Sequence, residues 1–242
     1  MVLHFLVESS TESVPGDTVS LTGAEAKHAA VVRRLRVGEA VTVGDGRGVW
    51  LSGVAEEVAP SRVDVRVTER VAHAAPVPRI VLVQALAKGD RDELAVQAAC
   101  ELGVDEIVPW QAARSVSRWE GPKAAKGRER WATIVREAAK QAHRAWVPDV
   151  ALPVSTVQLA QRAAEQRVLV LDPTASVRLS ELEPDGRDLV LVVGPEGGIA
   201  PEEIDRLADA GAERVRLGDT VLRTSTAGPA AIALLSAALG RW

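Results

Sequence analysis

Two glycine-containing segments, 194–198 and 218–219, follow predicted buried strands. The first comes after a continuous apolar run over 189–193, and the second after the apolar residues Val215 and Leu217. Glycine lets the backbone approach a ligand closely, and the carboxyl ends of parallel strands meet at one edge of a sheet, where open α/β folds bind ligands. The spacing is typical of a small-molecule site at that edge, and it also fits two ordinary turns.

Neither segment matches a nucleotide-binding motif. No Gly-Lys-Ser/Thr follows 194–198, which excludes a P-loop, and the spacing is not that of the dinucleotide fingerprint. A helix is predicted between the two segments, from Pro201 to Gly211, with Glu202 and Glu203 in its first turn. The helix would carry the chain from one strand exit to the next strand.

Two charged residues in these segments could act on a substrate. The carboxylate of Glu196 could remove a proton, bind a ligand or cap the next helix. The guanidinium group of Arg223 could stabilise negative charge that develops on a substrate, or it could form a structural ion pair.

Basic residues gather in two other stretches. Lys27, His28, Arg33, Arg34 and Arg36 cluster in the first, and the second, 111–148, interleaves arginines and lysines with tryptophans. Guanidinium groups bind phosphate, and aromatic rings stack on unpaired bases. Both stretches therefore suit RNA, and both also fit the solvated face of an amphipathic helix.

The element pattern changes at the proline-containing segment 73–78, which we interpret as a linker. Short apolar runs separated by Gly or Pro predict a small β-barrel or sandwich over residues 1–72. Strands at 80–86, 106–110 and 167–171 alternate with helices and predict an α/β domain over 79–242. An alanine-rich helix at 228–239 is apolar nearly all round, so it would be buried within one subunit or between two copies.

The composition is that of an ordinary globular protein, with 242 residues, 47% of them apolar, and a formal net charge of -4. This charge excludes a uniformly basic nucleic-acid coat but permits a local basic patch. Cys100 is the only cysteine, so we expect no disulfide and no cysteine-based metal cluster. No basic segment with a long apolar core begins the chain, and no apolar run approaches the roughly 20 residues of a membrane span. We expect a cytoplasmic protein without a metal site or a membrane anchor.

The run VGPEGGIAPEEI at 193–204, followed by RLGDTVLRTSTA at 216–227, resembles the cofactor-binding end of the knotted SPOUT-type methyltransferases. These two motifs are most similar to those of the RsmE family of 16S ribosomal RNA uridine-N3 methyltransferases. The resemblance implies an α/β fold with a deep trefoil knot, preceded by a small PUA-like β-barrel domain that binds RNA. It also implies S-adenosylmethionine as cofactor, a homodimer, and 16S RNA or the small ribosomal subunit as partner.

The same resemblance implies that three loops hold the cofactor. The expected cofactor-binding residues are Leu171, Asp172, Pro173, Gly194, Pro195, Glu196, Gly197, Gly198, Leu217, Gly218, Val221, Leu222, Arg223 and Thr224. From the residues alone, Asp172-Pro173 is simply a turn. We expect Arg223 to stabilise charge on the uracil oxygens or to orient a phosphate, and we keep Glu196 as the second candidate catalytic residue.

Family patterns also single out residues that would contact RNA. These are His28, Arg34, Arg36, Arg114, Gln141 and Arg144. The chain departs from the family at Arg33, where a leucine is usual, and at Lys140 and Ala142, where an acid and a serine are usual. Ser225 replaces a glutamate, so either that glutamate is not essential or another group does its work.

Two other functions remain open at this point. A SPOUT ribose 2′-O-methyltransferase would share the cofactor loops but not the amino-terminal domain. A catalytically inactive RNA-binding ribosome-assembly factor would not need intact cofactor binding. A nucleotide-dependent oxidoreductase is disfavoured by the missing dinucleotide fingerprint.

Overall fold

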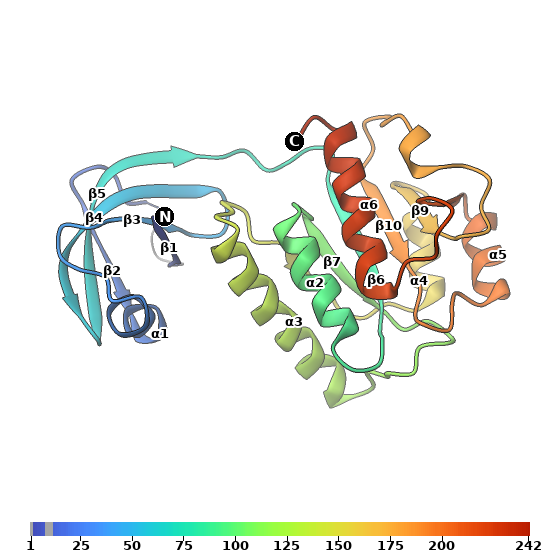
Figure 1. Cartoon of the computed structure of the whole chain (residues 1–242), viewed down its shortest axis with the longest axis horizontal. Coiled ribbons are helices and arrows are strands. Elements are labelled where there is room, and N and C mark those ends of the chain that lie inside the picture. The colour runs from blue at the N-terminus through green and yellow to red at the C-terminus, as the bar shows by residue number, and fades with distance from the viewer. Residues whose placement is uncertain (1, 8–11) are drawn as a thin grey trace. The chain divides into compact units, whose positions relative to one another are not determined.

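A computed structural model describes residues 2–7 and 12–242 and divides into two compact units. The first, called here the β unit, comprises Met1–Ala75 together with Ala139–Val147. The second, the α/β unit, comprises Pro76–Ala138 and Pro148–Trp242. Figure 1 shows the strands and helices of each. The linker predicted at 73–78 stays a prediction.

The β unit is built on a five-stranded sheet with the order β1-β3-β4-β5-β2. Its strands are β1 (Leu3–Leu6), β2 (Thr18–Thr22), β3 (Ala40–Gly44), β4 (Val49–Ala59) and β5 (Arg62–Ala72). Alternate residues of these strands, with Phe5, Leu21 and Leu51 among the largest, are buried in one core. Gly53 lies at a register shift between β4 and β5, and a Cβ there would come within 2.6 Å of the Arg66 carbonyl oxygen. The bulge therefore requires glycine.

A short helical segment follows β2 and covers part of this core. It consists of α1 (Gly23–Lys27) and a turn of π-helix, η2 (His28–Val32). Ala26 and Ala29 point into the core, while Val31 and Val32 are exposed. Lys27 is exposed on this segment, whereas Arg33, Arg34 and Arg36 lie in the loop after it, so only part of the basic cluster belongs to a helix.

The α/β unit contains a six-stranded sheet in the order β11-β9-β10-β6-β7-β8, in which all neighbours are parallel. The strands are β6 (Ile80–Ala85), β7 (Glu106–Trp110), β8 (Asp149–Val150), β9 (Arg167–Leu171), β10 (Leu189–Val193) and β11 (Glu213–Val215). Every residue of β6 and β10 is buried. Parallel strands covered on both faces read as continuous apolar runs, which is why the sequence predicted these strands.

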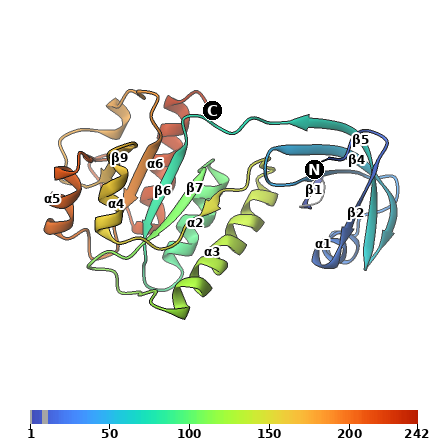
Figure 2. The same ribbon diagram turned by 180° about the vertical axis from the view of Figure 1, so that it is seen from behind.

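Helices cover both faces of this sheet (Figures 1 and 2). α2 (Arg91–Glu101), α3 (Pro122–Gln141) and α6 (Thr224–Ala238) lie on one side, and α4 (Thr156–Arg162) and α5 (Pro201–Asp209) lie on the other. A short 3₁₀ turn, η3 (Leu179–Glu181), follows β9. Leu159 of α4 and Leu207 of α5 join one core cluster with Val81 and Val83 of β6. A Cβ on Gly228 of α6 would approach Leu82 to 3.0 Å, so α6 lies close against the opposite face.

The last helix is not buried all round within one chain. α6 begins at Thr224, earlier than predicted, and buries Ala231, Ile232 and Leu235 on its inner side. Leu234 on the outer side is 39% exposed. The predicted interface between two copies remains a prediction.

Membrane spans and metal sites can be examined only in the residues that the structure describes. Across 2–7 and 12–242, no helix is long and apolar enough to span a bilayer. The same residues contain no cluster of three or more histidine, cysteine or acidic side chains arranged to hold a metal ion.

Candidate functional site

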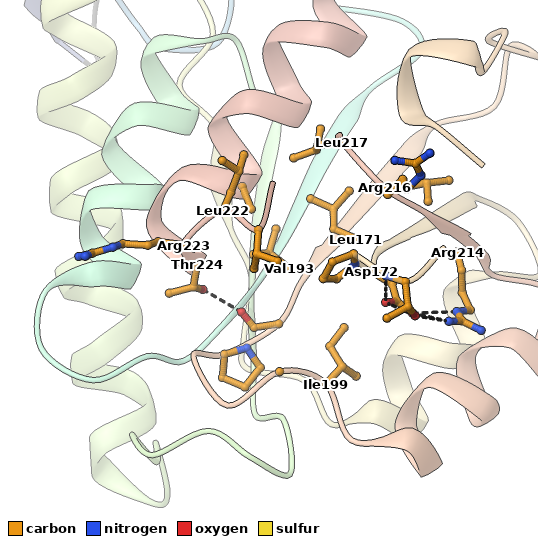
Figure 3. A pocket seen from close by; sticks show the side chains of 18 of the residues that line it. Leu171, Asp172, Val193, Ile199, Arg214, Arg216, Leu217, Leu222, Arg223 and Thr224 are labelled. Atoms are coloured by element: carbon orange, nitrogen blue, oxygen red, sulfur yellow. Dashed lines mark hydrogen bonds and ion pairs between the residues drawn. The ribbon is translucent and has the colours of Figure 1, made fainter. Parts of the chain in front are cut away.

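A cavity of about 750 Å³ opens at the carboxyl ends of β9, β10 and β11 (Figure 3). β9 pairs with both β10 and β11, so the three strand exits lie side by side at one edge of the sheet. Three loops, 171–174, 194–199 and 216–224, supply most of its wall, and we call it the loop pocket. The volume lies within the range of small-molecule and cofactor sites.

Every residue predicted to bind the cofactor lines the loop pocket except Gly197. A Cβ on Gly197 would instead lie 3.5 Å from the Cβ of Arg114, outside the pocket. Sequence reasoning did not assign several further lining residues to the cofactor. These are Arg91, Thr174, Val193, Ile199, Pro201, Ile204, Asp205, Arg214, Val215, Arg216, Thr220 and Ala227.

The first loop is fixed by Asp172, which is only 7% exposed. Its carboxylate accepts hydrogen bonds of 2.8 Å from the backbone N–H and the hydroxyl of Thr174, and another of 2.8 Å from Nε of Arg214. Burial acts to raise the pKa of Asp172, but the bonds from Thr174 and Arg214 outweigh it and hold the pKa below its ordinary value. Asp172 is therefore a charged anchor that joins the first loop to β11.

The second loop is held from three directions. The carboxylate of Glu196 accepts bonds of 2.9 Å from the Lys88 backbone N–H and from the Arg91 guanidinium. Arg114 donates to the Gly197 carbonyl at 3.2 Å, and the Thr224 hydroxyl donates to the Gly194 carbonyl at 2.8 Å. These bonds fix the glycine-rich backbone, which is otherwise free to adopt many conformations.

The charge on Glu196 follows from the same contacts. Burial acts to raise its pKa, but hydrogen bonds from its own backbone N–H, from Lys88 and from Arg91 hold the pKa below the ordinary value. A carboxylate whose charged form is stabilised in this way is a weak proton acceptor.

The third loop ends at the start of α6, where a buried hydrogen-bond chain begins. The side-chain amide of Gln84, the last residue but one of β6, donates to the Thr224 hydroxyl at 2.9 Å, and Thr224 donates onward to the Gly194 carbonyl. Gln84 is fully buried, and its Oε1 has no hydrogen-bond partner among the residues that the structure describes. Sequence reasoning missed Gln84 because a single polar residue within a buried apolar run has no distinguishing periodicity.

Arg223 lines the loop pocket as the residue that precedes α6. In Figure 3 its side chain extends away from Asp172 and Arg214 on the other side of the pocket. The side chain is exposed, so its guanidinium group is accessible from solvent.

Most residues predicted to contact RNA belong to the β unit. His28, Arg34, Arg36, Gln141 and Arg144 all lie there, whereas Arg114 lies in the α/β unit. Arg34 is exposed and adopts a left-handed conformation with φ 54. Gln141 and Arg144 were predicted within the second domain, and the structure groups them with the first unit instead.

Two of the tryptophans between 111 and 148 have a structural role. Trp131 is buried and its ring meets that of Trp119 edge-on, with 5.0 Å between the centroids. A Cβ on Gly127 would lie 2.5 Å from the Trp119 ring, so the helix backbone contacts the ring directly. These rings pack against each other within the α/β unit, which fits an amphipathic helix with one buried side.

Known RNA methyltransferases are similar to this protein along nearly the whole chain. The family model of the RNA methyltransferase domain matches residues 73–236, and that of the RNA methyltransferase PUA domain matches residues 21–68. Ribosomal RNA small subunit methyltransferase E of Mycobacterium bovis is 43% identical over 94% of this chain and 89% of its own length. The protein of that name from Bacillus subtilis is 33% identical over 96% of this chain and 93% of its own length.

Solved structures show the same similarity. The crystal structure of a ribosomal RNA small subunit methyltransferase E from Neisseria gonorrhoeae, bound to S-adenosyl methionine, has a TM-score of 0.88 and 28% identity, with 98% of each chain covered. A methyltransferase from Legionella pneumophila in complex with the cofactor SAM has a TM-score of 0.87 and 31% identity, again with 98% of each chain covered.

The predicted fold class is confirmed by these comparisons, which pair a PUA-like domain with a SPOUT-type α/β methyltransferase domain. The loop pocket lies within the part matched by the methyltransferase family model. With relatives at 43% and 33% identity over almost their full lengths, the chain belongs to the family of ribosomal RNA small subunit methyltransferase E.

Proposed function

We propose that this protein transfers a methyl group from S-adenosylmethionine to N3 of a uridine in the 16S RNA of the small ribosomal subunit. The observation that carries the proposal is the loop pocket, in which three anchored loops meet at the carboxyl edge of the sheet in a chain of this family. Its nearly full-length similarity to a relative crystallised with S-adenosyl methionine supports the choice of cofactor.

The residues present fit such a cofactor. The pocket walls combine apolar side chains such as Leu171 and Leu222 with backbone groups of the loops. A Cβ on Gly218 would meet no atom within 4 Å, so the backbone there faces open space that a ligand can approach. We infer that 171–174, 194–199 and 216–224 hold the cofactor, whose sulfonium carries the methyl group to be transferred.

The protein must then orient the uridine and favour loss of its N3 proton. The exposed guanidinium of Arg223, at the rim of the pocket, is our candidate for stabilising negative charge on the uracil oxygens. Glu196 is better suited to hold the second loop, because its hydrogen bonds stabilise the charged form and weaken it as a base. Positioning and exclusion of water would supply the remaining rate acceleration.

Exposed apolar side chains near the pocket bear on how the protein assembles. We infer that the working unit is a homodimer, since Val221, Leu222 and Leu234 expose apolar surface around the pocket and α6. We place the protein in the cytoplasm, where small-subunit RNA is assembled into ribosomes.

Calorimetric titration with S-adenosylmethionine tests the site directly. Gly218→Arg should abolish binding, because the new side chain would enter the pocket from a position where a Cβ clashes with nothing. Ala208→Arg is the matched control, since it adds the same cation to an exposed position of α5 that does not line the pocket. Equal affinity of wild type and Gly218→Arg would contradict the assigned site.

The reaction is tested on RNA. Small-subunit RNA from cells lacking the gene, incubated with the protein and the methyl donor, should gain 3-methyluridine on nucleoside mass analysis. A ribose-methylated nucleoside in its place would mean 2′-O transfer. Cofactor binding without any methylated product, on naked RNA and on subunits, would favour an assembly factor.

A further inference from the structure

The segment Ala139–Val147 is fastened to the β unit by backbone contacts. The Gly48 N–H donates to the Ala145 carbonyl and the Val147 N–H donates to the Gly46 carbonyl, both at 3.0 Å. The indole N–H of Trp146 donates to the His73 carbonyl, also at 3.0 Å. A segment far from the sheet in sequence thereby extends the β unit.

A buried ion pair lies at the start of this segment. The Lys140 ammonium is 2.9 Å from Oε1 of Glu25 on α1, and the two side chains are 6% and 16% exposed. The charge of Lys140 also reaches His4, whose pKa it helps to lower, after burial and the effect of His143. Removing two charges from water carries a desolvation cost that close pairing must offset, so such a pair is better suited to fixing a geometry than to adding stability.

The pair joins two segments that are distant in sequence and that both carry cations. Lys140 directly precedes Gln141 and lies four residues before Arg144, while Glu25 lies three residues before His28. The exposed residues Arg33, Arg34 and Arg36 lie in the loop that directly follows this helical segment. Their positive charge suits binding to a phosphate backbone, and Arg144 in the segment 139–147 supplies a further positive charge.

We propose that Lys140 is a positioning residue for RNA. Paired with Glu25, it holds 139–147 so that Arg144 and the arginines at 33–36 bind one stretch of RNA backbone. Lys140 itself is too buried to contact RNA, so it acts through Arg144. The inference rests on the proposed function for the identity of the RNA.

A double-mutant cycle with salt titration tests this. The variants Lys140→Met, Arg144→Ala and their combination would be measured for binding to a transcript of 16S RNA at several salt concentrations. Each single variant should bind about tenfold more weakly, the loss expected for one charge-assisted contact. Each should also lower the slope of log affinity against log salt by about 1. The combination should be no weaker than either single change.

Three further measurements separate positioning from folding and from catalysis. Glu25→Gln, which keeps a hydrogen-bonding side chain without charge, should show the same loss of RNA affinity and the same lower salt slope, and it replaces Lys140→Met if that variant does not fold. The exchange Glu25→Lys with Lys140→Glu should restore affinity, because it restores the pair. Calorimetric affinity for S-adenosylmethionine should be the same in every variant.

Additive losses, an unchanged salt slope in both Lys140→Met and Glu25→Gln, or no binding of RNA by the wild type would overturn the inference. Failure of the wild type to bind S-adenosylmethionine or to transfer a methyl group would overturn the proposed function instead. The two failures are thus distinguishable on the same samples.

Discussion

His4 should make the β unit sensitive to mild acid. Its imidazole is 6% exposed, stacks flat on Trp50 with 4.0 Å between the ring centroids, and lies 3.0 Å from the Thr42 hydroxyl. Burial, followed by the nearby His143 and Lys140, lowers the pKa of His4 from 6.5 to about 3. The folded protein therefore keeps this ring neutral over a range in which the unfolded chain would protonate it.

The sign and size of the effect follow from linkage. Because the folded pKa is below the unfolded one, the unfolded state binds more protons below pH 6.5, so stability is full above that value and falls as the pH decreases toward 3. Each pH unit well inside this window costs about 1.4 kcal/mol. Between about pH 7 and about pH 5 the loss from His4 should be about 2 kcal/mol.

Hydrogen exchange on peptides from β3, β4 and β5, corrected for the intrinsic pH dependence of exchange, measures the opening free energy of the β unit. The control is His4→Phe, which keeps a ring against Trp50 but cannot titrate. Wild type should lose about 2 kcal/mol more than the control over this interval. Parallel pH profiles for the two proteins would refute the argument that burial of His4 controls its titration.

Three other substitutions test how the loops are anchored. Thr224→Val should weaken binding of S-adenosylmethionine about tenfold, because it removes the bond from Gln84 and the bond to the Gly194 carbonyl, whereas Thr224→Ser should not; equal calorimetric affinities for the two variants would argue against the anchor. Arg214→Met should also weaken cofactor affinity and raise the pKa of Asp172, so that affinity falls at a higher pH than in wild type during an acid titration; an unchanged profile would mean that Arg214 does not control the first loop. Glu196→Gln should reduce kcat by less than about tenfold if the carboxylate only holds the loop, and a loss of a hundredfold or more in steady-state assays would identify it as a base.

The strands and the helix around the site could be predicted because each depends on residues that are close together in the sequence. The buried strands β9 and β10 have the bounds that their apolar runs predicted, and α5 begins at Pro201, where proline favours a first helical position. Parallel packing of these strands then brings their exits together. The resemblance supplied the cofactor, which spacing alone did not identify.

Other features depend on contacts between residues distant in sequence. The role of Arg214 follows from the pairing of β11 with β9, which brings it to Asp172, 42 residues earlier. The attachment of 139–147 to the β unit depends on backbone bonds to Gly46 and Gly48, about which the periodicity of α3 says nothing. Gly197 was placed at the cofactor because it belongs to the motif, although its backbone faces Arg114.

The chain of hydrogen bonds from Gln84 through Thr224 to Gly194 ties the second and third loops to the central strand β6. The first loop is tied to β11 through Asp172 and Arg214. A receptor whose walls are already ordered loses little conformational entropy when it is filled. The cofactor should therefore associate in a single kinetic phase whose rate rises in proportion to its concentration, with no slower step for closing a lid. Turnover would then be governed by the chemistry and by how quickly the spent cofactor and the methylated RNA leave.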